Sequence, residues 1–306
     1  MDHIYDLVIV GSGPAGLSAV VYAQRAKLDT IVIEKVPMSG GQILNTYEVD
    51  NYLGMPNMNG FDMGMKFREH ADNLGATFIN GNVEKIIDEG EIKTVVTNKE
   101  NYKTRTVLIT SGAEPRKLGL ENEKRLAGAG VSYCATCDGA FFRNKTTMVV
   151  GGGDVAVEDA IFLARLCEKV YVVHRRDEFR AAKIYSDKLK TLENVEIIWD
   201  SALEDINGDA QVYSAIVKNV KTEEKREIEV DGVFIAVGMI PNTKEYEGLI
   251  ELDKSNYIVA EEDGITNVPG VFVAGDARTK RLRQIVTAVS DGANAISSAE
   301  RYINTL

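Results

Sequence analysis

A strand, a glycine-rich turn, a helix and a second strand follow one another twice in this chain of 306 residues, and this repeat limits the possible folds more than any other feature. In the first copy, an apolar strand at residues 5–10 runs into the glycine turn, and a second buried strand is expected at 30–34. In the second copy, the strands are expected at 147–150 and 170–173, with a helix through Leu166 between them. Two such units predict an α/β chain with two Rossmann-like dinucleotide-binding domains.

Glycine turns of this kind suit the pyrophosphate of a dinucleotide. Glycine lets the backbone approach the phosphates, and the free N–H groups and dipole at the start of the following helix stabilise their charge. One isolated motif is weak evidence, because glycines also mark ordinary turns, whereas two motifs in full strand-helix-strand context are much stronger. The residues expected around the pyrophosphates are Gly11, Ser12, Gly13, Pro14, Ala15 and Gly16 in the first copy and Gly152, Gly153 and Asp154 in the second.

The residue at the end of the second strand differs between the copies, and this difference assigns the cofactors. Glu34 ends the first copy, and its carboxylate would accept hydrogen bonds from the hydroxyls of an unphosphorylated ribose, so this site suits FAD. At the same spacing in the second copy the strand ends in His174, Arg175 and Arg176, with Arg180 shortly after. Guanidinium groups suit a 2′-phosphate, which a carboxylate would repel, so this site suits NADPH. The alternative is that the arginines form a solvated surface cluster.

A second repeated signature marks the domain borders. Residues 107–115 form a strand that runs into a Gly/Pro crossover, and residues 233–241 repeat this pattern. We therefore expect residues 1–114 and 242–306 to form the FAD-binding domain. Residues 115–241 would form an NADPH-binding domain that also carries a Cys-x-x-Cys pair and is inserted within the FAD-binding domain.

The composition argues against several classes of partner. With 35 basic and 46 acidic side chains the net charge is −11, which argues against a nucleic acid or an anionic membrane as partner. The N-terminal residues lack a basic segment, and glycines interrupt their apolar stretch long before it reaches transmembrane length. Three cysteines, two of them a close pair, suit a reducing compartment. We therefore expect a cytoplasmic protein.

Cys134 and Cys137 are spaced so that they can close a small redox-active disulfide, and one of the two could attack an external disulfide as a thiolate. The alternative is half of a zinc site, which would need two further ligands. The remaining candidates, Cys167 and three histidines, are not in paired spacing, so we expect no metal. Cys167 lies in an apolar helical run and is expected to be a buried small apolar residue.

Together, these motifs resemble one family closely, the low-molecular-weight, bacterial-type thioredoxin reductases. The similarity runs nearly end to end and includes both glycine motifs, Gly40-Gly41-Gln42, residues 134–139, the histidine and arginine cluster, Gly275-Asp276 and Arg283-Gln284. It implies FAD and NADPH as cofactors, a homodimer, and thioredoxin as the protein substrate. It also implies that Cys137 faces the flavin, that Cys134 attacks thioredoxin, and that Asp138 is the acid or base that manages the thiol proton. Asp138 could instead only cap a turn or a helix.

The resemblance implies further cofactor contacts. Asp276 would bind hydroxyls of FAD, and Arg283, Gln284 and Ile285 would open a last helix whose positive end faces the flavin. The other expected contacts are Lys35, Gly41, Gln42, Asn51, Gly112, Gly238 and Gly275. Leu282 and Asp154 depart from the family pattern, which commonly has an aromatic residue at the first position and an uncharged one at the second. The charge of Asp154 bears on the affinity for the nicotinamide cofactor.

The order of the parts indicates a mechanism. The cysteine pair and the nicotinamide site belong to the same inserted domain, yet both must reach the flavin. We therefore expect this domain to rotate about the crossovers at 112–115 and 238–241. Three alternatives stay open: a relative that draws electrons from ferredoxin, a reductase of another small dithiol protein, and a nucleotide-sensing binding protein with a structural cysteine pair.

Overall fold

The computed structural model describes residues 3–46, 49 and 51–306, and it divides into two compact units. Unit 1 comprises Met1–Glu114 and Ile240–Leu306, and unit 2 comprises Pro115–Met239. Unit 2 is thus inserted within unit 1, and each unit is built on a largely or wholly parallel sheet with helices, which confirms the predicted α/β class.

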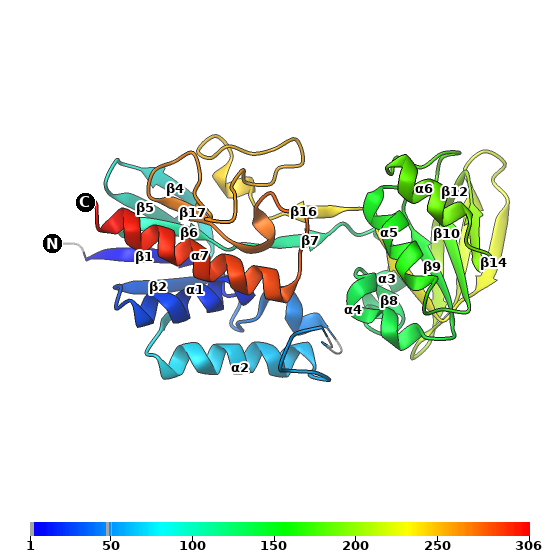
Figure 1. Cartoon of the computed structure of the whole chain (residues 1–306), viewed down its shortest axis with the longest axis horizontal. Helices are drawn as coiled ribbons and strands as arrows, with labels where there is room; N and C mark the ends of the chain where they lie inside the picture. Colours follow the sequence, from blue (N-terminus) through cyan, green and yellow to red (C-terminus); the bar gives the residue numbers. More distant parts are fainter. Residues whose placement is uncertain (1–2, 47–48, 50) are drawn as a thin grey trace. The chain divides into compact units, whose positions relative to one another are not determined.

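The sheet of unit 1 has seven strands (Figure 1). Its order is β3 (Thr77–Asn80), β2 (Thr30–Glu34), β1 (Ile4–Val10), β6 (Asn101–Ile109), β5 (Lys93–Thr97) and β4 (Val83–Asp88), with β17 (Val271–Val273) also paired to β6. The pairs among β1, β2, β3, β6 and β17 are parallel, whereas β5 pairs with β4 and β6 in antiparallel fashion. Because parallel strands end at one edge of a sheet, the turns after β1, β2 and β17 gather there.

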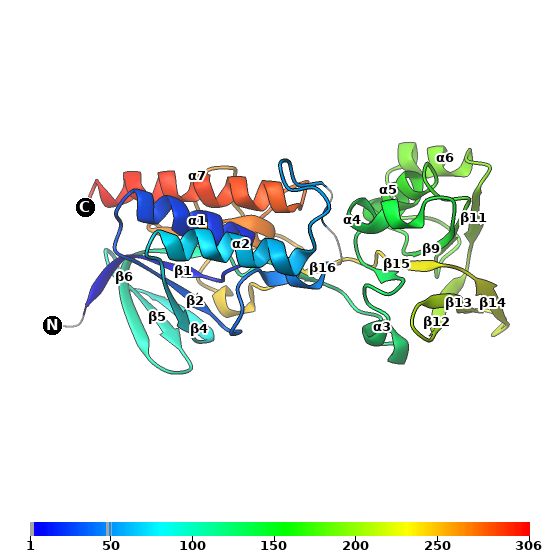
Figure 2. The ribbon, with the colours of Figure 1, turned by 90° about the horizontal axis from the view of Figure 1, so that it is seen from below.

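Both faces of this sheet are covered, which explains why its central strands are apolar throughout. Leu7 and Ile9 of β1 pack in one core cluster with α1 (Pro14–Arg25) and α7 (Ile285–Ile303). Val8 and Val10 point to the opposite face and pack with β4 and β5. The helices α1 and α7 lie side by side, and α2 (Gly60–Asn73) lies next to α1 (Figures 1 and 2).

Small residues let α1 and α7 approach each other closely. A Cβ atom on Gly292 would lie 2.3 Å from the carbonyl oxygen of Ala15, so a larger residue does not fit at this point of α7. Ala19 and Ala295 are fully buried in the same cluster. Pro14 occupies the first helical position of α1, where the missing N–H group of proline is not needed. The start of α1 is therefore fixed by packing as well as by its own sequence.

Unit 2 contains a five-stranded parallel sheet in the order β11 (Val195–Ile198), β10 (Lys169–Val173), β9 (Thr146–Val150), β15 (Gly232–Ile235) and β8 (Val131–Ser132). One face packs against α4 (Ala135–Asp138), α5 (Asp154–Leu163) and α6 (Lys183–Lys190). The other face packs against an antiparallel sheet of β12 (Ser201–Gly208), β13 (Val212–Asn219) and β14 (Lys225–Glu229). Figure 2 shows these three layers.

The remaining elements are short. They are α3 (Glu121–Arg125), β7 (Ala113–Pro115), β16 (Met239–Pro241) and the 3-10 turns Gly41–Asn45, Gly139–Phe142, Lys244–Tyr246 and Gly275–Ala277. The strands β7 and β16 lie in the predicted crossovers and pair with each other in a two-stranded sheet. Among the residues described, no helix is both long and apolar enough to cross a membrane.

The helix after the second glycine turn is shorter than predicted. It ends at Leu163 and does not continue through Leu166. The N–H groups of Arg165 and Leu166 donate to the carbonyl groups of Phe162 and Leu163, so the chain tightens into turns with a three-residue spacing. No glycine or proline marks this end in the sequence, which is why the apolar pattern alone overestimates the helix.

Candidate active site

The first glycine turn joins β1 to α1 in unit 1. Gly11 has a φ angle of +106°, and a Cβ atom there would lie 2.6 Å from the carbonyl oxygen of Thr110. A Cβ atom on Gly16 would lie 2.0 Å from the carbonyl oxygen of Gly11, so both positions require glycine. Next to Gly13, by contrast, the nearest atom would be the Cα atom of Gly41, at 4.0 Å. The turn is therefore tightly packed at Gly11 and Gly16, whereas the backbone at Gly13 is open.

Glu34 ends β2 and is hydrogen-bonded to the glycine turn. Its Oε2 atom accepts hydrogen bonds from the backbone N–H group of Ser12 at 2.7 Å and from the Ser12 hydroxyl at 2.8 Å. Its Oε1 atom accepts one from the N–H group of Val36 at 3.1 Å. A carboxylate offers about four acceptor positions, so Glu34 can accept at least one further hydrogen bond. The neighbouring residue Lys35 is exposed, and its Nζ atom lies 3.7 Å from the Oε1 atom of Glu114.

The predicted loop at residues 40–42 lies against the same turn. A Cβ atom on Gly41 would lie 3.2 Å from the Cα atom of Gly13, and the preceding N–H group donates to the Ser12 carbonyl at 2.8 Å. The Gln42 side chain donates a hydrogen bond to the carbonyl group of Ala113. The structure thus brings Gly41 and Gln42 together with the first glycine motif.

Asp276 follows β17 at the same edge of the sheet. Gly275 before it has a φ angle of +78°, and the Oδ1 atom of Asp276 is buried and has no hydrogen-bond partner among the residues that the structure describes. Burial raises the pKa of this carboxyl group, although the positive charges of Lys280 and Arg283 oppose the shift. A buried acceptor without a donor from the chain is an available position for a ligand hydroxyl.

A buried ionic cluster supports this loop from behind, and the sequence analysis missed it. Asp291 of α7 accepts hydrogen bonds from the N–H group of Gly275 at 2.9 Å, from Arg278 at 2.7 and 2.9 Å, and from Lys280 at 2.8 Å. Burial alone would raise the pKa of Asp291, but the hydrogen bonds and charges of Arg278 and Lys280 lower it. The sequence did contain a signal for this cluster, because Asp291 is a carboxylate on the buried face of an amphipathic helix.

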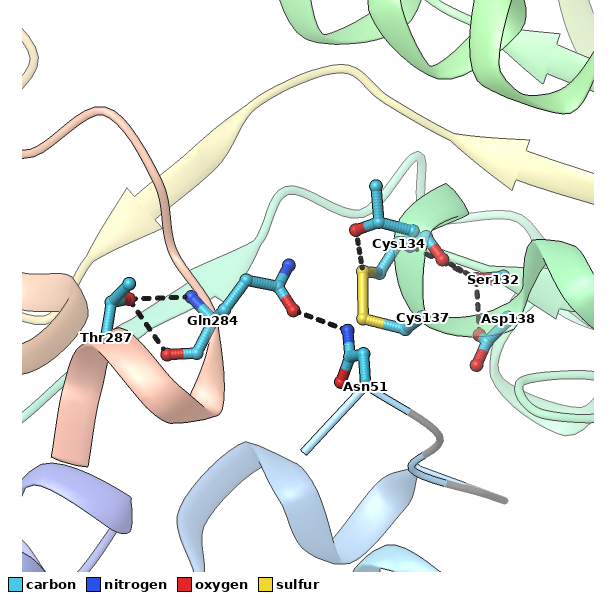
Figure 3. The surroundings of a disulfide bond; sticks show 8 residues. Asn51, Ser132, Cys134, Cys137, Asp138, Gln284 and Thr287 are labelled. Carbon is cyan, nitrogen blue, oxygen red and sulfur yellow. Dashed lines mark hydrogen bonds between the residues drawn. A yellow bond between two sulfur atoms is a disulfide. The ribbon is translucent and has the colours of Figure 1, made fainter. Parts of the chain in front are cut away.

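The start of α7 connects several predicted residues. The Oε1 atom of Gln284 accepts a hydrogen bond from the side chain of Asn51 at 2.9 Å (Figure 3). The guanidinium group of Arg283 lies 4.0 Å from the ring centre of Tyr257. Ile285, the first residue of α7, packs against an apolar cluster of α2 and its neighbouring loop. The structure therefore holds Asn51 and Gln284 together although they are distant in the sequence.

The second glycine turn joins β9 to α5 in unit 2. A Cβ atom on Gly152 would lie 2.2 Å from the ring of His174, whereas no atom lies within 4 Å of such an atom on Gly153. The His174 ring stacks on Phe179, with ring centres 5.7 Å apart, and meets Trp199 edge-on at 6.3 Å. His174 thus fills the space behind Gly152, and the backbone at Gly153 stays open.

His174 is itself almost fully buried, with 5% of its surface exposed. Its Nε2 atom has no hydrogen-bond partner among the described residues. Burial lowers the pKa of His174, and the charges of the three neighbouring arginines lower it further, against a backbone hydrogen bond that raises it. The imidazole is therefore neutral at physiological pH.

The arginine segment is hydrogen-bonded to the glycine turn. The N–H group of Arg180 donates to the carbonyl group of Gly152 at 2.8 Å, and the N–H group of Ala182 donates to the Asp154 carboxylate at 2.7 Å. The carboxylate that departs from the family pattern is thus hydrogen-bonded within its own chain. The side chains of Arg175, Arg176 and Arg180 are exposed, and within the described part of the chain none has an ion-pair partner.

Cys134 and Cys137 form a disulfide, with Cys134 at the N-cap of α4 and Cys137 within it (Figure 3). Asp138 follows, and its Oδ2 atom accepts a hydrogen bond from the Ser132 hydroxyl at 2.6 Å. Burial raises the pKa of Asp138, and the hydrogen bond from Ser132 opposes this shift. Asp138 stands at the N-cap of the next 3-10 turn, yet its side chain makes no capping hydrogen bond. Ser132 is a second residue that the sequence analysis did not identify.

The two crossover glycines have open surroundings. Gly112 and Gly238 have φ angles of +70° and +113°, and no atom of the described part of the chain lies within 4 Å of a Cβ atom placed on either. The carbonyl group of Gly112 accepts a hydrogen bond from Asn242, and that of Gly238 accepts one from Arg116, both at 2.9 Å. These backbone conformations favour glycine, although no neighbouring atom restricts the size of the residue.

The third cysteine is separate from this chemistry. Cys167 is buried in the apolar cluster between the parallel sheet and α5, as predicted, and burial raises the pKa of its thiol. In the ranges 3–46 and 51–306 there is no group of three or more histidine, cysteine or acidic side chains that could hold a metal ion.

Comparison with known proteins defines the class. The profile of the family described as pyridine nucleotide-disulphide oxidoreductase matches residues 5–292, so the chain belongs to this family of oxidoreductases. The thioredoxin reductase of Listeria innocua is 47% identical to the chain over 100% of the chain and 96% of its own length. The thioredoxin reductase of Bacillus subtilis is 43% identical, again over 100% of the chain and 96% of its own length. Among solved structures, the thioredoxin reductase of Streptococcus pyogenes MGAS5005 has a TM-score of 0.94 at 42% identity, with 100% of each chain covered.

Proposed function

We propose that this chain is a thioredoxin reductase in which electrons pass from NADPH to FAD, then to the Cys134–Cys137 disulfide, and finally to oxidised thioredoxin. The observation that carries the proposal is the disulfide, which forms inside an α/β unit with a glycine turn and has a carboxyl group beside it. The full-length similarity to thioredoxin reductases supports the same reaction.

Unit 1 fits FAD. The open backbone at Gly13 leaves room for a pyrophosphate at the start of α1. Glu34 retains acceptor capacity for ribose hydroxyls, and the unpartnered Oδ1 atom of Asp276 can accept a hydrogen bond from a hydroxyl of the flavin side chain. The other residues that we assign to FAD are Gly11, Ser12, Pro14, Ala15, Gly16, Lys35, Gly41, Gln42, Asn51, Gly112, Gly275, Arg283, Gln284 and Ile285.

Unit 2 fits NADPH. Gly153 leaves the backbone open at the start of α5, and three exposed guanidinium groups without ion-pair partners in the described chain stand after β10. We assign the 2′-phosphate to Arg175, Arg176 and Arg180, with His174 beneath the glycine turn and Asp154 and Gly238 at the edge of the site. A ferredoxin-dependent reductase would not need this cluster, which favours NADPH as the electron donor.

The cysteine pair would reduce thioredoxin by two exchange steps. The Cys134 thiolate attacks one sulfur of the thioredoxin disulfide, which forms a mixed disulfide and releases the other thioredoxin sulfur as a thiolate. The Cys137 thiolate then attacks the Cys134 sulfur, which restores the Cys134–Cys137 disulfide and releases the second thioredoxin sulfur. Two electrons pass to thioredoxin, and its sulfurs take up the two protons that the reduced cysteine pair carried, one of them by way of Asp138.

Unit 2 would have to move between the two half-reactions, because both its cysteine pair and its nicotinamide site serve one flavin. We assign this rotation to the crossovers, where Gly112 and Gly238 have positive φ angles and supply backbone positions without a Cβ atom. A cross-link that locks the units should leave one half-reaction intact and abolish turnover. Normal turnover in a verified locked enzyme would contradict the rotation.

The proposed setting is a homodimer in the cytoplasm, without nucleic acid or membrane as partner. The resemblance to bacterial-type thioredoxin reductases supports the dimer, and the low cysteine content supports a reducing compartment. Light scattering of the holoenzyme should give twice the mass of one chain, and a mass of one chain would contradict the dimer.

The electron donor is tested by anaerobic mixing of the holoenzyme with nicotinamides. NADPH should bleach the flavin absorbance rapidly and stoichiometrically, and much faster than NADH does. A flavin that NADPH leaves oxidised but reduced ferredoxin bleaches would instead support the ferredoxin-dependent alternative.

A further inference from the structure

The hydroxyl group of Ser132 lies between Asp138 and the backbone of Cys134 (Figure 3). Its Oγ atom lies 2.6 Å from the Oδ2 atom of Asp138, to which it donates. The same oxygen accepts a hydrogen bond from the N–H group of Cys134 at 3.1 Å and lies 3.3 Å from the Cys134 carbonyl oxygen. Ser132 ends β8 and is buried, with 5% of its surface exposed, so this oxygen has little access to solvent.

The Ser132 hydroxyl group can form a different set of hydrogen bonds in each protonation state of Asp138. A hydroxyl has one proton to donate and two lone pairs that accept. When Asp138 is ionised, the Ser132 proton points to the carboxylate and one lone pair receives the Cys134 N–H group. When Asp138 carries a proton, the carboxylic acid donates to the second lone pair, and the Ser132 proton can turn to the Cys134 carbonyl group. All groups are hydrogen-bonded in both states.

We propose that Ser132 is a positioning residue whose single hydroxyl proton follows the protonation of Asp138, so that gain or loss of a proton at Asp138 rearranges the hydrogen bonds around Cys134. This inference rests on the proposed function, in which Asp138 manages the thiol proton. No bond between heavy atoms forms or breaks in this rearrangement. The proton that Asp138 gains or loses is the one exchanged with the thiols of the cysteine pair or of thioredoxin.

The electrostatic surroundings give Ser132 this influence. Burial raises the pKa of Asp138, and the hydrogen bond from Ser132 is the opposing cause. The helix packed against α4 carries Asp154, Glu158 and Asp159, and none of these charges contributes to the shift of Asp138. The 3-10 turn that follows α4 has no titratable side chain. The hydroxyl of Ser132 is therefore the main polar influence on the carboxyl group.

The test uses the holoenzyme after reduction with dithiothreitol and anaerobic removal of the reductant. The rate of alkylation of Cys134 by iodoacetamide is measured against pH, because the charge of Asp138 alters the reactivity of the neighbouring thiols. Asp138→Asn identifies the inflection that belongs to Asp138. Ser132→Ala removes the hydroxyl, and Ser132→Thr retains it. Ser186→Ala is the control, because it removes another buried hydroxyl, one that donates to the backbone carbonyl groups of Ala181 or Ala182.

We expect the Asp138 inflection to move to higher pH by about one unit in Ser132→Ala, because the charged carboxylate loses its donor. Ser132→Thr and Ser186→Ala should keep the inflection at the pH of the wild type. A general effect of altered packing would instead shift the inflection in these variants as well. Ser132→Gly is a second hydroxyl-free variant and should reproduce the shift if the alanine variant fails to fold.

An unchanged inflection in both hydroxyl-free variants would overturn the inference, as would an equal shift in Ser132→Thr or the absence of any inflection that depends on Asp138. These alkylation rates need neither NADPH nor thioredoxin. A failure of the proposed function would show separately, as a wild type that does not reduce thioredoxin with NADPH.

Discussion

The backbone N–H group and the hydroxyl group of Ser12 both donate to the same oxygen of Glu34, at 2.7 and 2.8 Å. The first glycine turn and the acid that ends β2 therefore form one hydrogen-bonded structure. This arrangement orients the second carboxylate oxygen and reduces the rearrangement that binding of a ribose would require.

Glu34→Gln should weaken FAD binding. The substitution places an amide donor where one carboxylate oxygen accepts, so either Ser12 or the ribose hydroxyls lose an acceptor. We expect the affinity of the apoprotein for FAD to fall on the order of tenfold, measured by quenching of FAD fluorescence. Glu114→Gln removes the same charge from the exposed partner of Lys35 and should have no effect. Equal affinities of the two variants would count against the assignment of Glu34.

Gly152→Ala and Gly153→Ala should behave differently. The added methyl group at Gly152 would meet the His174 ring, which Phe179 and Trp199 hold in place, whereas the position at Gly153 is open. We expect Gly152→Ala to destabilise the protein by about 1 to 3 kcal/mol and Gly153→Ala to leave the stability nearly unchanged. Chemical denaturation of the apoprotein measures the difference. Similar stabilities would contradict the packing described.

The arginine cluster should discriminate between the two nicotinamide cofactors. Arg176→Ala should weaken NADPH binding on the order of tenfold and leave NADH binding unchanged, because only NADPH carries the 2′-phosphate. The single tryptophan of the chain, Trp199, lies 4.5 Å from the ring of Phe179 beside this site, so its fluorescence can report binding. Arg165→Ala, an exposed arginine of the same unit, is the control. An equal loss for both cofactors would remove the basis for assigning the phosphate.

The buried cluster around Asp291 should matter for stability and for its pH dependence. Asp291→Asn leaves Arg278 and Lys280 without a counter-charge, and we expect a loss of about 3 kcal/mol. Asp72→Asn removes an exposed partner of Arg68 and should cost less than about 1 kcal/mol.

The stability lost in Asp291→Asn should depend on pH, and the direction of the Asp291 pKa shift gives the sign of this dependence. The pKa of Asp291 is lower in the folded protein than in the unfolded chain, so its pairing stabilises the protein above about pH 4. That contribution is lost as the pH falls through the folded-state pKa, and the gap between wild type and Asp291→Asn should narrow in urea denaturation at acidic pH. A gap that does not change with pH would contradict the pairing.

Local patterns were sufficient to predict the two repeated units. The strands β1, β2, β9 and β10 were predicted to within one residue of their observed limits, because apolar β-branched runs and glycine turns are signals of neighbouring residues. The predicted fold class is confirmed. The assignments of individual residues to FAD and NADPH stay predictions, which the experiments above test.

Contacts between distant residues could not be predicted in this way. The bond between Asn51 and Gln284 and the cluster of Asp291 with Gly275 depend on how strands and helices pack, not on local spacing. Ser132 precedes the cysteine pair by only two positions, yet its hydrogen bond to Asp138 depends on the way α4 turns Asp138 back toward β8. The sheet of β12, β13 and β14 was also not predicted, although the alternation of its strands and the Asn207-Gly208 pair before the β12–β13 turn were available local signals.

The most direct test of the central claim is the reduction of thioredoxin by NADPH in the presence of the holoenzyme. The wild type and Cys167→Ser should reduce thioredoxin catalytically, whereas Cys134→Ser and Cys137→Ser should retain the bound flavin and its bleaching by NADPH but lose turnover by at least about a thousandfold. Turnover that survives in Cys134→Ser, or a wild type whose cysteine pair stays oxidised under excess NADPH without oxygen, would contradict the account.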